Sequence, residues 1–176
     1  MEKSGTVWIT TTAFFIALLI VAQLATAPLG QIFTGSAVNF VLIVAVMTCG
    51  YASGITVTIV SPIVAHVMGI GPFWPLIPFI IAGNFTLVTV WHFMSKLKLS
   101  NKTILRAATL SAAAVCKFIV LYIGIVTVAV PFLLNLSEQQ SAMITVMFSA
   151  PQLVNALIGG TLAAVVLPAM ERFIKF

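Results

Sequence analysis

Charged residues are scarce in this chain. Lys and Arg number 8, and Asp and Glu number 3, so only 6% of the 176 residues carry charge. A soluble domain carries about 25% charged residues because its surface must face water. With 61% hydrophobic residues, this chain cannot cover itself with a polar surface, and lipid must be its main solvent. The net charge of +5 comes from too few cations to form a nucleic-acid-binding patch.

Motifs for catalysis and metal binding are also missing. The chain has no GxxxxGK[ST] phosphate loop, no HExxH, no GxSxG and no paired carboxylates. Its two cysteines, Cys49 and Cys116, lie in apolar runs without a second thiol or a histidine at metal-binding spacing. General acid–base chemistry would have almost no carboxylates to use. We therefore expect a protein that is not an enzyme and holds no metal and no cofactor.

Glycine, proline and charged residues divide the apolar sequence into six segments. The first ends at Pro28, because proline cannot continue a helix without losing a hydrogen bond. Pro131 is expected to end the fifth helix, while Pro78 and Pro151 predict an irregularity and a kink inside the fourth and sixth helices. The sequence predicts a single transmembrane domain over residues 1–176, with helices at residues 7–27, 36–49, 53–68, 73–95, 103–130 and 142–170.

The first apolar segment could be either a cleaved signal peptide or a retained transmembrane helix. Ala25-Thr26-Ala27 resembles a signal-peptide cleavage site. However, the run from Val7 to Ala25 approaches the length of about 20 residues of a full span, and Pro28 would follow the cut. We expect a retained helix.

The second helix would cover only about 20 Å of a bilayer core about 30 Å thick. Helices 2 and 3 could therefore form one bent hairpin that does not fully cross, although six spans are favoured.

The basic residues orient the bundle. With six helices, the connections after helices 1, 3 and 5 contain no Lys or Arg, and Glu138 lies in the last of them. All the basic segments then fall on one side, which the positive-inside rule makes cytoplasmic. We expect an all-α, six-helix integral membrane protein of a bacterial plasma membrane, with both termini in the cytoplasm. The residues that carry this argument are Lys3, Lys96, Lys98, Lys102, Arg106, Arg172 and Lys175.

Lys117 is the most informative residue of the sequence. It lies near the middle of the fifth helix, about 13 residues or about 20 Å from either end, which is too far for its ammonium group to reach the membrane surface easily. A lysine at this depth costs about 2.5–3.5 kcal/mol on insertion scales. No acidic residue lies at the same depth. This predicts either a bound anion or a partner set of local carbonyls and amides.

Further polar residues are expected in the outer half of the bundle. Asn84 lies level with Lys117, and Asn39 and His66 lie nearer the outer face. On the sixth helix, Ser149, Gln152, Asn155 and Gly159 share one face at helical spacing. Together these positions predict a site for a small molecule, although amides in membrane helices often only bind neighbouring helices.

Two aromatic residues, Phe73 and Trp74, flank a Gly-Pro break above this site and are candidates to stack on a ligand ring. Membrane-interface anchoring is an equally good explanation for them. His66 could likewise be an interfacial histidine with a structural role.

Ala13 and Ala17 stand four residues apart on the first helix, a spacing that lets two membrane helices approach closely. Together with the six-helix layout and the chain length, this alanine pair resembles the substrate-binding S components of energy-coupling factor (ECF) transporters. The resemblance implies a small vitamin-like substrate, and a scaffold subunit that docks on Ala13 and Ala17 and is driven by two ATPases. It also implies a ligand site under residues 28–35 and 69–73, above Asn84, Lys117, Gln152 and Asn155.

Two other functions remain open from the sequence. A standalone proton-coupled transporter would use Lys117 or His66 as its titrating group. A membrane assembly protein would use the polar residues only to hold helices together.

Overall fold

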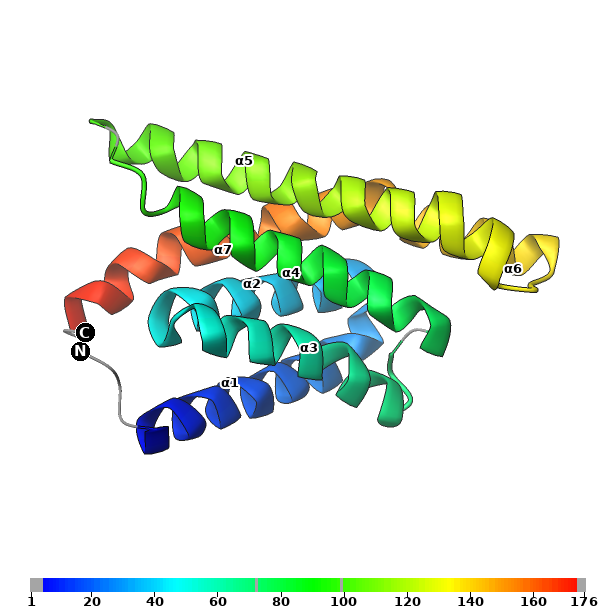
Figure 1. The fold of residues 1–176 in the computed structure, drawn as a ribbon, viewed down its shortest axis with the longest axis horizontal. Helices are drawn as coiled ribbons and strands as arrows, with labels where there is room; N and C mark the ends of the chain where they lie inside the picture. The colour runs from blue at the N-terminus through cyan, green and yellow to red at the C-terminus, as the bar shows by residue number, and fades with distance from the viewer. Residues whose placement is uncertain (1–4, 72, 99, 174–176) are drawn as a thin grey trace.

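The structure is a computed structural model that describes residues 5–71, 73–98 and 100–173, with side chains described as far as residue 170. The described residues form helices and their connections, and no strand occurs among them. Figure 1 shows the helices lying along the long axis of the molecule, with the start of α1 (Gly5–Thr26) and the end of α7 (Ala150–Phe173) at the same end of the bundle. The expected all-helical class is confirmed.

Five helical segments in the described part are long and apolar enough to cross a bilayer, and α3 is a shorter apolar helix of 17 residues. The remaining elements, in chain order, are a 3₁₀ turn η1 (Ala27–Leu29), α2 (Gln31–Cys49), α3 (Tyr51–Val67), a second 3₁₀ turn η2 (Trp74–Leu76), α4 (Ile77–Met94), α5 (Lys102–Leu121), a π-helical continuation η3 (Tyr122–Leu133) and α6 (Glu138–Met147).

Helix α2 forms the centre of the bundle. It packs against α1, α3, α4 and α7, and the residues from Val41 to Val46 are all buried. A helix that is apolar on every face is stable only when other helices surround it. Gly30 and Gly50 flank α2 with φ angles of 93° and 95°, a conformation that side chains with a Cβ disfavour. These glycines let the chain reverse sharply at each end of the central helix.

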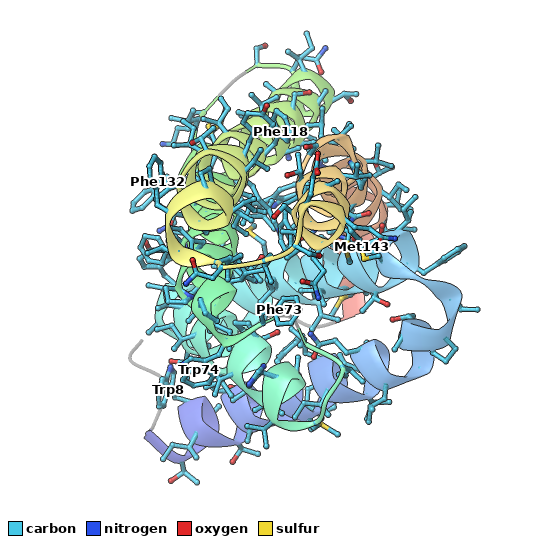
Figure 2. The ribbon with its side chains drawn as sticks, turned by 90° about the vertical axis from the view of Figure 1, so that its right-hand side faces the viewer. Trp8, Phe73, Trp74, Phe118, Phe132 and Met143 are labelled. Atoms are coloured by element: carbon cyan, nitrogen blue, oxygen red, sulfur yellow. The ribbon has the colours of Figure 1, made fainter. Side chains whose placement is uncertain are left out.

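The outer surface of the bundle is apolar. Phe132 is 79% exposed, and other large apolar side chains, including Phe14 and Val165, are also exposed. Figure 2 looks onto the end of the bundle that carries α6 and shows Phe132 and Trp8 at the perimeter. A soluble monomer rarely exposes so much continuous apolar surface. The fold is therefore that of a helical membrane protein.

The second helix begins earlier than the sequence predicts. The expected start was residue 36, whereas α2 begins at Gln31 and runs for 19 residues. Gly35 was expected in the preceding loop, but it lies inside α2, packed tightly against the side chain of Asn155. At about 1.5 Å per residue, α2 is about 28 Å long. It can cross the bilayer core, so the short-hairpin alternative loses its main support.

The prolines act differently from the sequence prediction at two of three positions. Pro78 lies in the first turn of α4, where no backbone donor is required, and the predicted irregularity is the change from the 3₁₀ turn η2 to α4 just before it. Pro131 does not end the fifth helix, which continues through π-helical geometry to Leu133. Pro151 does not kink a continuous sixth helix. Instead, the chain breaks after Met147 into α6 and α7, with Pro151 in the first turn of α7.

Helices α2 and α7 approach closely at Gly159. A Cβ at this position would lie 2.7 Å from the Cβ of Asn39 and 2.9 Å from the backbone nitrogen of Phe40, and closer still to the carbonyl oxygen of Ser36. Two of these three atoms belong to the backbone of α2, which cannot move without shifting the helix. Glycine is therefore required for the observed spacing between the two helices.

Replacement of Gly159 by alanine is expected to lower the stability of the protein by about 1–3 kcal/mol, the usual cost of overpacking. Thermal unfolding in detergent measures this effect. Gly5→Ala is the matched control, because a Cβ at Gly5 would have no neighbouring atom within 4 Å. Equal melting temperatures for the two variants would contradict the described packing of α2 on α7.

Candidate functional site

Lys117 lies in the interior of the bundle and links three helices. Its side chain is 4% exposed. The ammonium group on α5 donates hydrogen bonds to the amide oxygen of Asn39 on α2, at 2.5 Å, and to that of Asn84 on α4, at 2.6 Å. Hydrogen bonds from an ammonium donor are stronger than those between neutral groups. Of the partners predicted for Lys117, amides are therefore present, and they come from helices far apart in the sequence.

The positive charge of Lys117 has no carboxylate beside it in the described part of the chain. Only Glu138 among the acidic residues has a described side chain, and it stands at the start of α6, at the far end of the bundle in Figure 1. An ammonium group has three donors, of which the two asparagines use two. A buried charge is stable only when it is paired or fully hydrogen-bonded, so a charged Lys117 has one donor left for a further partner.

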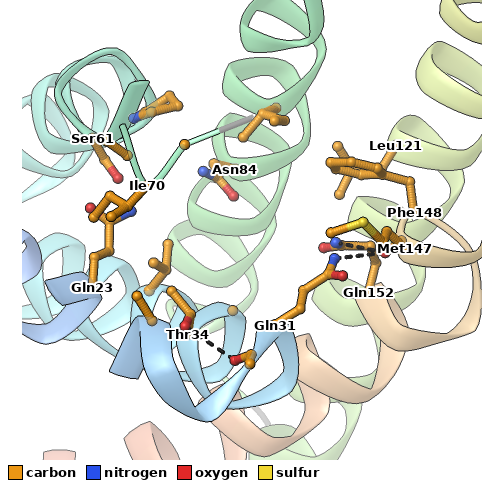
Figure 3. Close-up of a pocket in the computed structure, with 18 of the residues that line it drawn as sticks. Gln23, Gln31, Thr34, Ser61, Ile70, Asn84, Leu121, Met147, Phe148 and Gln152 are labelled. Carbon is orange, nitrogen blue, oxygen red and sulfur yellow. Dashed lines mark hydrogen bonds between the residues drawn. The ribbon is translucent and has the colours of Figure 1, made fainter. Parts of the chain in front are cut away.

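Lys117 faces a cavity of about 340 Å³. This volume is near the lower end of the range of about 300–1,000 Å³ found for small-molecule sites. The cavity lies between the ends of several helices (Figure 3), in the half of the bundle that Figure 1 shows remote from the start of α1 and the end of α7. Its polar lining consists of Gln23, Gln31, Thr34, Ser61, Asn84, Lys117 and Gln152, and its apolar lining includes Val38, Pro62, Ile80, Leu121 and Phe148.

The break between α6 and α7 contributes two of the polar groups. In a continuous helix, the carbonyl of Met147 would accept a hydrogen bond from residue 151, but proline has no N–H to donate. The side-chain amides of Gln31 and Gln152 donate to this carbonyl instead, at 2.8 Å and 3.2 Å. Figure 3 shows both bonds meeting at Met147. Pro151 therefore explains why two glutamines are held at the cavity wall.

Removal of both amides by Gln31→Met and Gln152→Met leaves the Met147 carbonyl without a donor. We expect a loss of stability of about 0.5–1.5 kcal/mol, the net contribution of a typical hydrogen bond. In a Pro151→Ala background the backbone N–H of residue 151 can bond this carbonyl, so the same double change should cost less. Thermal unfolding of the four proteins tests this. An equal loss in both backgrounds would show that the glutamines do not serve the Met147 carbonyl.

Several buried polar atoms near the cavity have no protein partner. These include the side-chain oxygen of Gln23, which lines the cavity, the amide nitrogen of Asn39 and the hydroxyl of Ser36. Buried polar atoms in proteins are nearly always hydrogen-bonded, so each unpaired group calls for a partner such as a ligand or ordered water. The site thus offers both donors and acceptors in addition to the charge of Lys117.

The structure gathers some of the predicted site residues but not all. Lys117, Asn84 and Gln152 line the cavity. Asn39 contacts Lys117, so the prediction that it lies near the outer face is wrong. Because α2 begins at residue 31, Asn39 is about 12 Å from the start of its helix. Asn155 is fully buried but packs against Gly35, outside the cavity lining.

Three predicted residues lie away from this cavity. Phe73 and Trp74 are 52% and 58% exposed, at the end of the bundle seen in Figure 2. His66 packs on Trp74 with ring centroids 5.2 Å apart. None of the three is among the residues that line the cavity. Their direct contact with a ligand stays a prediction.

Four polar residues of the cavity were not predicted from the sequence. They are Gln23, Gln31, Thr34 and Ser61. A signal for the glutamines existed, because an amide in an apolar helix is as unusual at residues 23 and 31 as at residue 152. Thr34 and Ser61 gave no such signal, since hydroxyl groups in membrane helices commonly bond their own backbone. The two segments expected above the ligand do contribute, through Gly30 and Gly71 among others.

The alanines of the first helix lie on its outer face. Ala13 and Ala17 are both exposed, whereas Phe15 and Leu19 of the same helix are buried against the bundle. A second helix could therefore reach them without displacing any part of this chain.

Comparison of the chain with family models, with curated proteins and with solved structures finds no match.

Proposed function

We propose that this protein binds a small anionic molecule, most simply a carboxylate, inside a bundle of membrane helices. The observation that carries the proposal is the buried ammonium of Lys117, which faces a cavity of about 340 Å³ and has no described carboxylate partner. A carboxylate that enters the cavity would pair with this ammonium, while the amides of Gln23, Gln31 and Gln152 hydrogen-bond its other polar groups. Catalysis is not part of the proposal.

The proposed orientation places the cavity in the outer half of the membrane. The connection between α4 and α5 lies at the same end of the bundle as the start of α1 and the end of α7 (Figure 1). This end carries Lys96, Lys98, Lys102 and Arg106. Under the positive-inside rule it faces the cytoplasm. With α3 as a sixth span, both termini are cytoplasmic and the cavity opens toward the outside of the cell.

We further propose that the protein is the substrate-binding subunit of an ECF-type importer in a plasma membrane. The exposed pair Ala13 and Ala17 supports this, because small residues allow a scaffold helix to pack closely on α1. The chain carries no phosphate-binding loop of its own, so two separate ATPase subunits would supply the energy. The cargo would be a vitamin-like molecule that the cell takes up from outside.

A ligand screen tests the binding step. Thermal unfolding of the purified protein is followed against a panel of small carboxylate-bearing vitamins. A true ligand at about 100 times its Kd should stabilise the protein by about 2.7 kcal/mol. A panel in which neutral and cationic members stabilise the protein as well as the anions would contradict the proposed role of Lys117.

The importer step is tested with Ala17→Leu. We expect this change to reduce ligand uptake at least about tenfold in cells that contain the scaffold and both ATPases, because a bulky side chain blocks close helix contact. Ligand affinity of the purified variant should be unchanged. Ala107→Leu, at another exposed alanine on α5, is the matched control. Uptake that persists without any ATPase and stops when the proton gradient is removed would instead favour a standalone transporter.

A further inference from the structure

A second cavity lies at the basic end of the bundle, remote from Lys117. Its volume is about 420 Å³, and it is lined by the ends of α2 and α4, the connection to α5, the start of α5 and the C-terminal half of α7. Its polar lining consists of Ser95, Lys98, Lys102, Arg106 and Thr109, and its apolar lining consists of Met47, Trp91, Leu97, Leu105, Ala164, Leu167 and Pro168. The site proposed above shares no residue with it.

Three cations line this second cavity. Lys98, Lys102 and Arg106 have no acidic partner among the described side chains, since Glu138 lies at the opposite end of the bundle. Lys102 is also the first residue of α5, and no acidic residue lies in the first turn of that helix. Cations at a helix N-terminus are unfavourable, because the helix dipole is positive there. No described side chain therefore supplies the negative charge that would stabilise the cluster.

A buried hydroxyl supplies independent evidence that the cavity holds a ligand. Thr109 is only 2% exposed, and its hydroxyl oxygen has no hydrogen-bond partner. Other helical threonines in this chain, such as Thr48 and Thr86, donate to the carbonyl four residues earlier. Thr109 does not use this local acceptor, although it lines the cavity. An acceptor inside the cavity would satisfy it.

We propose that this second cavity binds a phosphate group. Arg106 and the two lysines provide charged donors, and a phosphate offers several strong acceptor oxygens in return. The hydroxyl of Thr109 donates to one of these oxygens. The apolar side of the cavity, including Trp91 and Leu167, suits a phosphate that is attached to hydrocarbon, as in a phospholipid headgroup. Basic pockets between membrane helices on the cytoplasmic side are known to hold such headgroups. This site does not depend on the function proposed for the first cavity.

The lipid arm of the test uses phosphatidylglycerol. Native mass spectrometry counts the lipids that remain on the protein as phosphatidylglycerol is titrated against phosphatidylcholine. Each basic side chain should contribute about fivefold in affinity, so Lys98→Gln, Lys102→Gln and Arg106→Gln together should weaken the tightest site at least about 100-fold. Lys96→Gln is the matched control, because Lys96 lies in the same connection but does not line the cavity. Thr109→Val should weaken binding without any change in charge.

The soluble arm uses inorganic phosphate. Stabilisation of the wild-type protein by phosphate, but not by chloride at matched ionic strength, and its loss in the triple variant would assign the site to a soluble phosphate. Either a lipid result or a soluble result supports the proposal. If the triple variant does not fold, Arg106→Gln and Thr109→Val decide the outcome. Binding that Lys96→Gln weakens as much as Arg106→Gln, or that Thr109→Val leaves unchanged, would overturn the proposal, as would the absence of binding in both arms.

Discussion

Replacement of Lys117 by methionine is expected to weaken binding of the anionic ligand by at least about 30-fold. Loss of one partner of a buried, hydrogen-bonded charge pair costs about 2–5 kcal/mol, and a loss of about 1.4 kcal/mol is tenfold in affinity. Methionine keeps a similar length and shape but removes all three donors of the ammonium group. Isothermal calorimetry in detergent measures the affinity for whichever carboxylate the thermal screen identifies.

The control for this experiment is Lys96→Gln, which removes an exposed lysine and should leave affinity unchanged. Lys117→Met should also remain folded, because the change removes the desolvation cost of a buried ammonium along with its two hydrogen bonds to Asn39 and Asn84. Far-UV circular dichroism and gel filtration check this. A folded Lys117→Met protein with wild-type affinity would remove Lys117 from the ligand site.

Replacement of Asn84 by leucine is expected to destabilise the protein by about 1.5–3 kcal/mol, the contribution of a hydrogen bond to a charged group. The amide oxygen of Asn84 accepts from Lys117 at 2.6 Å, and leucine would leave the ammonium with only one protein partner, Asn39. The same change in a Lys117→Met background should cost much less, because no charge remains to be solvated. Thermal unfolding of the four proteins gives the coupling energy.

The two changes should therefore be strongly non-additive. Thr86→Ala on the same helix is a suitable control, since its hydroxyl bonds only the carbonyl of Ala82 and should show no coupling to Lys117→Met. Additive costs for Asn84→Leu and Lys117→Met would mean that the ammonium and the amide do not interact in the folded protein.

The sequence allowed the central residue of the site to be predicted for a physical reason. A lysine near the middle of a membrane helix must face the interior, and in the absence of a carboxylate its partners must be amides, carbonyls or a bound anion. Asn84 was placed level with Lys117 because of the rise of about 1.5 Å per residue, and the hydrogen bond between the two residues agrees with that depth. Depth along a helix is a local property, so it can be calculated from spacing alone.

The predicted depth of Asn39 in the membrane was wrong because the predicted start of its helix, residue 36, was five residues too late. Gly30 and Gly35 both resemble helix-ending residues in the sequence, but only Gly30 adopts a positive φ angle. Gly35 continues the helix, where the absence of a side chain makes room for Asn155 of α7. This choice depends on a contact between residues more than 100 positions apart, which the local sequence does not contain.

The position of Gln31 and Gln152 at the cavity could be predicted only in part from the sequence. Pro151 indicated that the last span would be irregular, but a kinked helix and a broken helix have the same local sequence. Pro151 leaves the Met147 carbonyl without its helical donor, but the local sequence does not show which side chains bind that carbonyl instead. The cavity itself is the space left between the seven α-helices α1 to α7, so no pattern of residues along one of them could reveal its volume.

The most direct test of the central claim is native mass spectrometry of the protein purified from its own host, with Lys117→Met purified in parallel. The account predicts that wild-type protein carries one small anionic molecule, which denaturation releases, and that the Lys117→Met protein carries none. Preparations of both proteins that are free of any small molecule, and that bind no carboxylate when it is added, would contradict the account. So would a molecule bound equally by both.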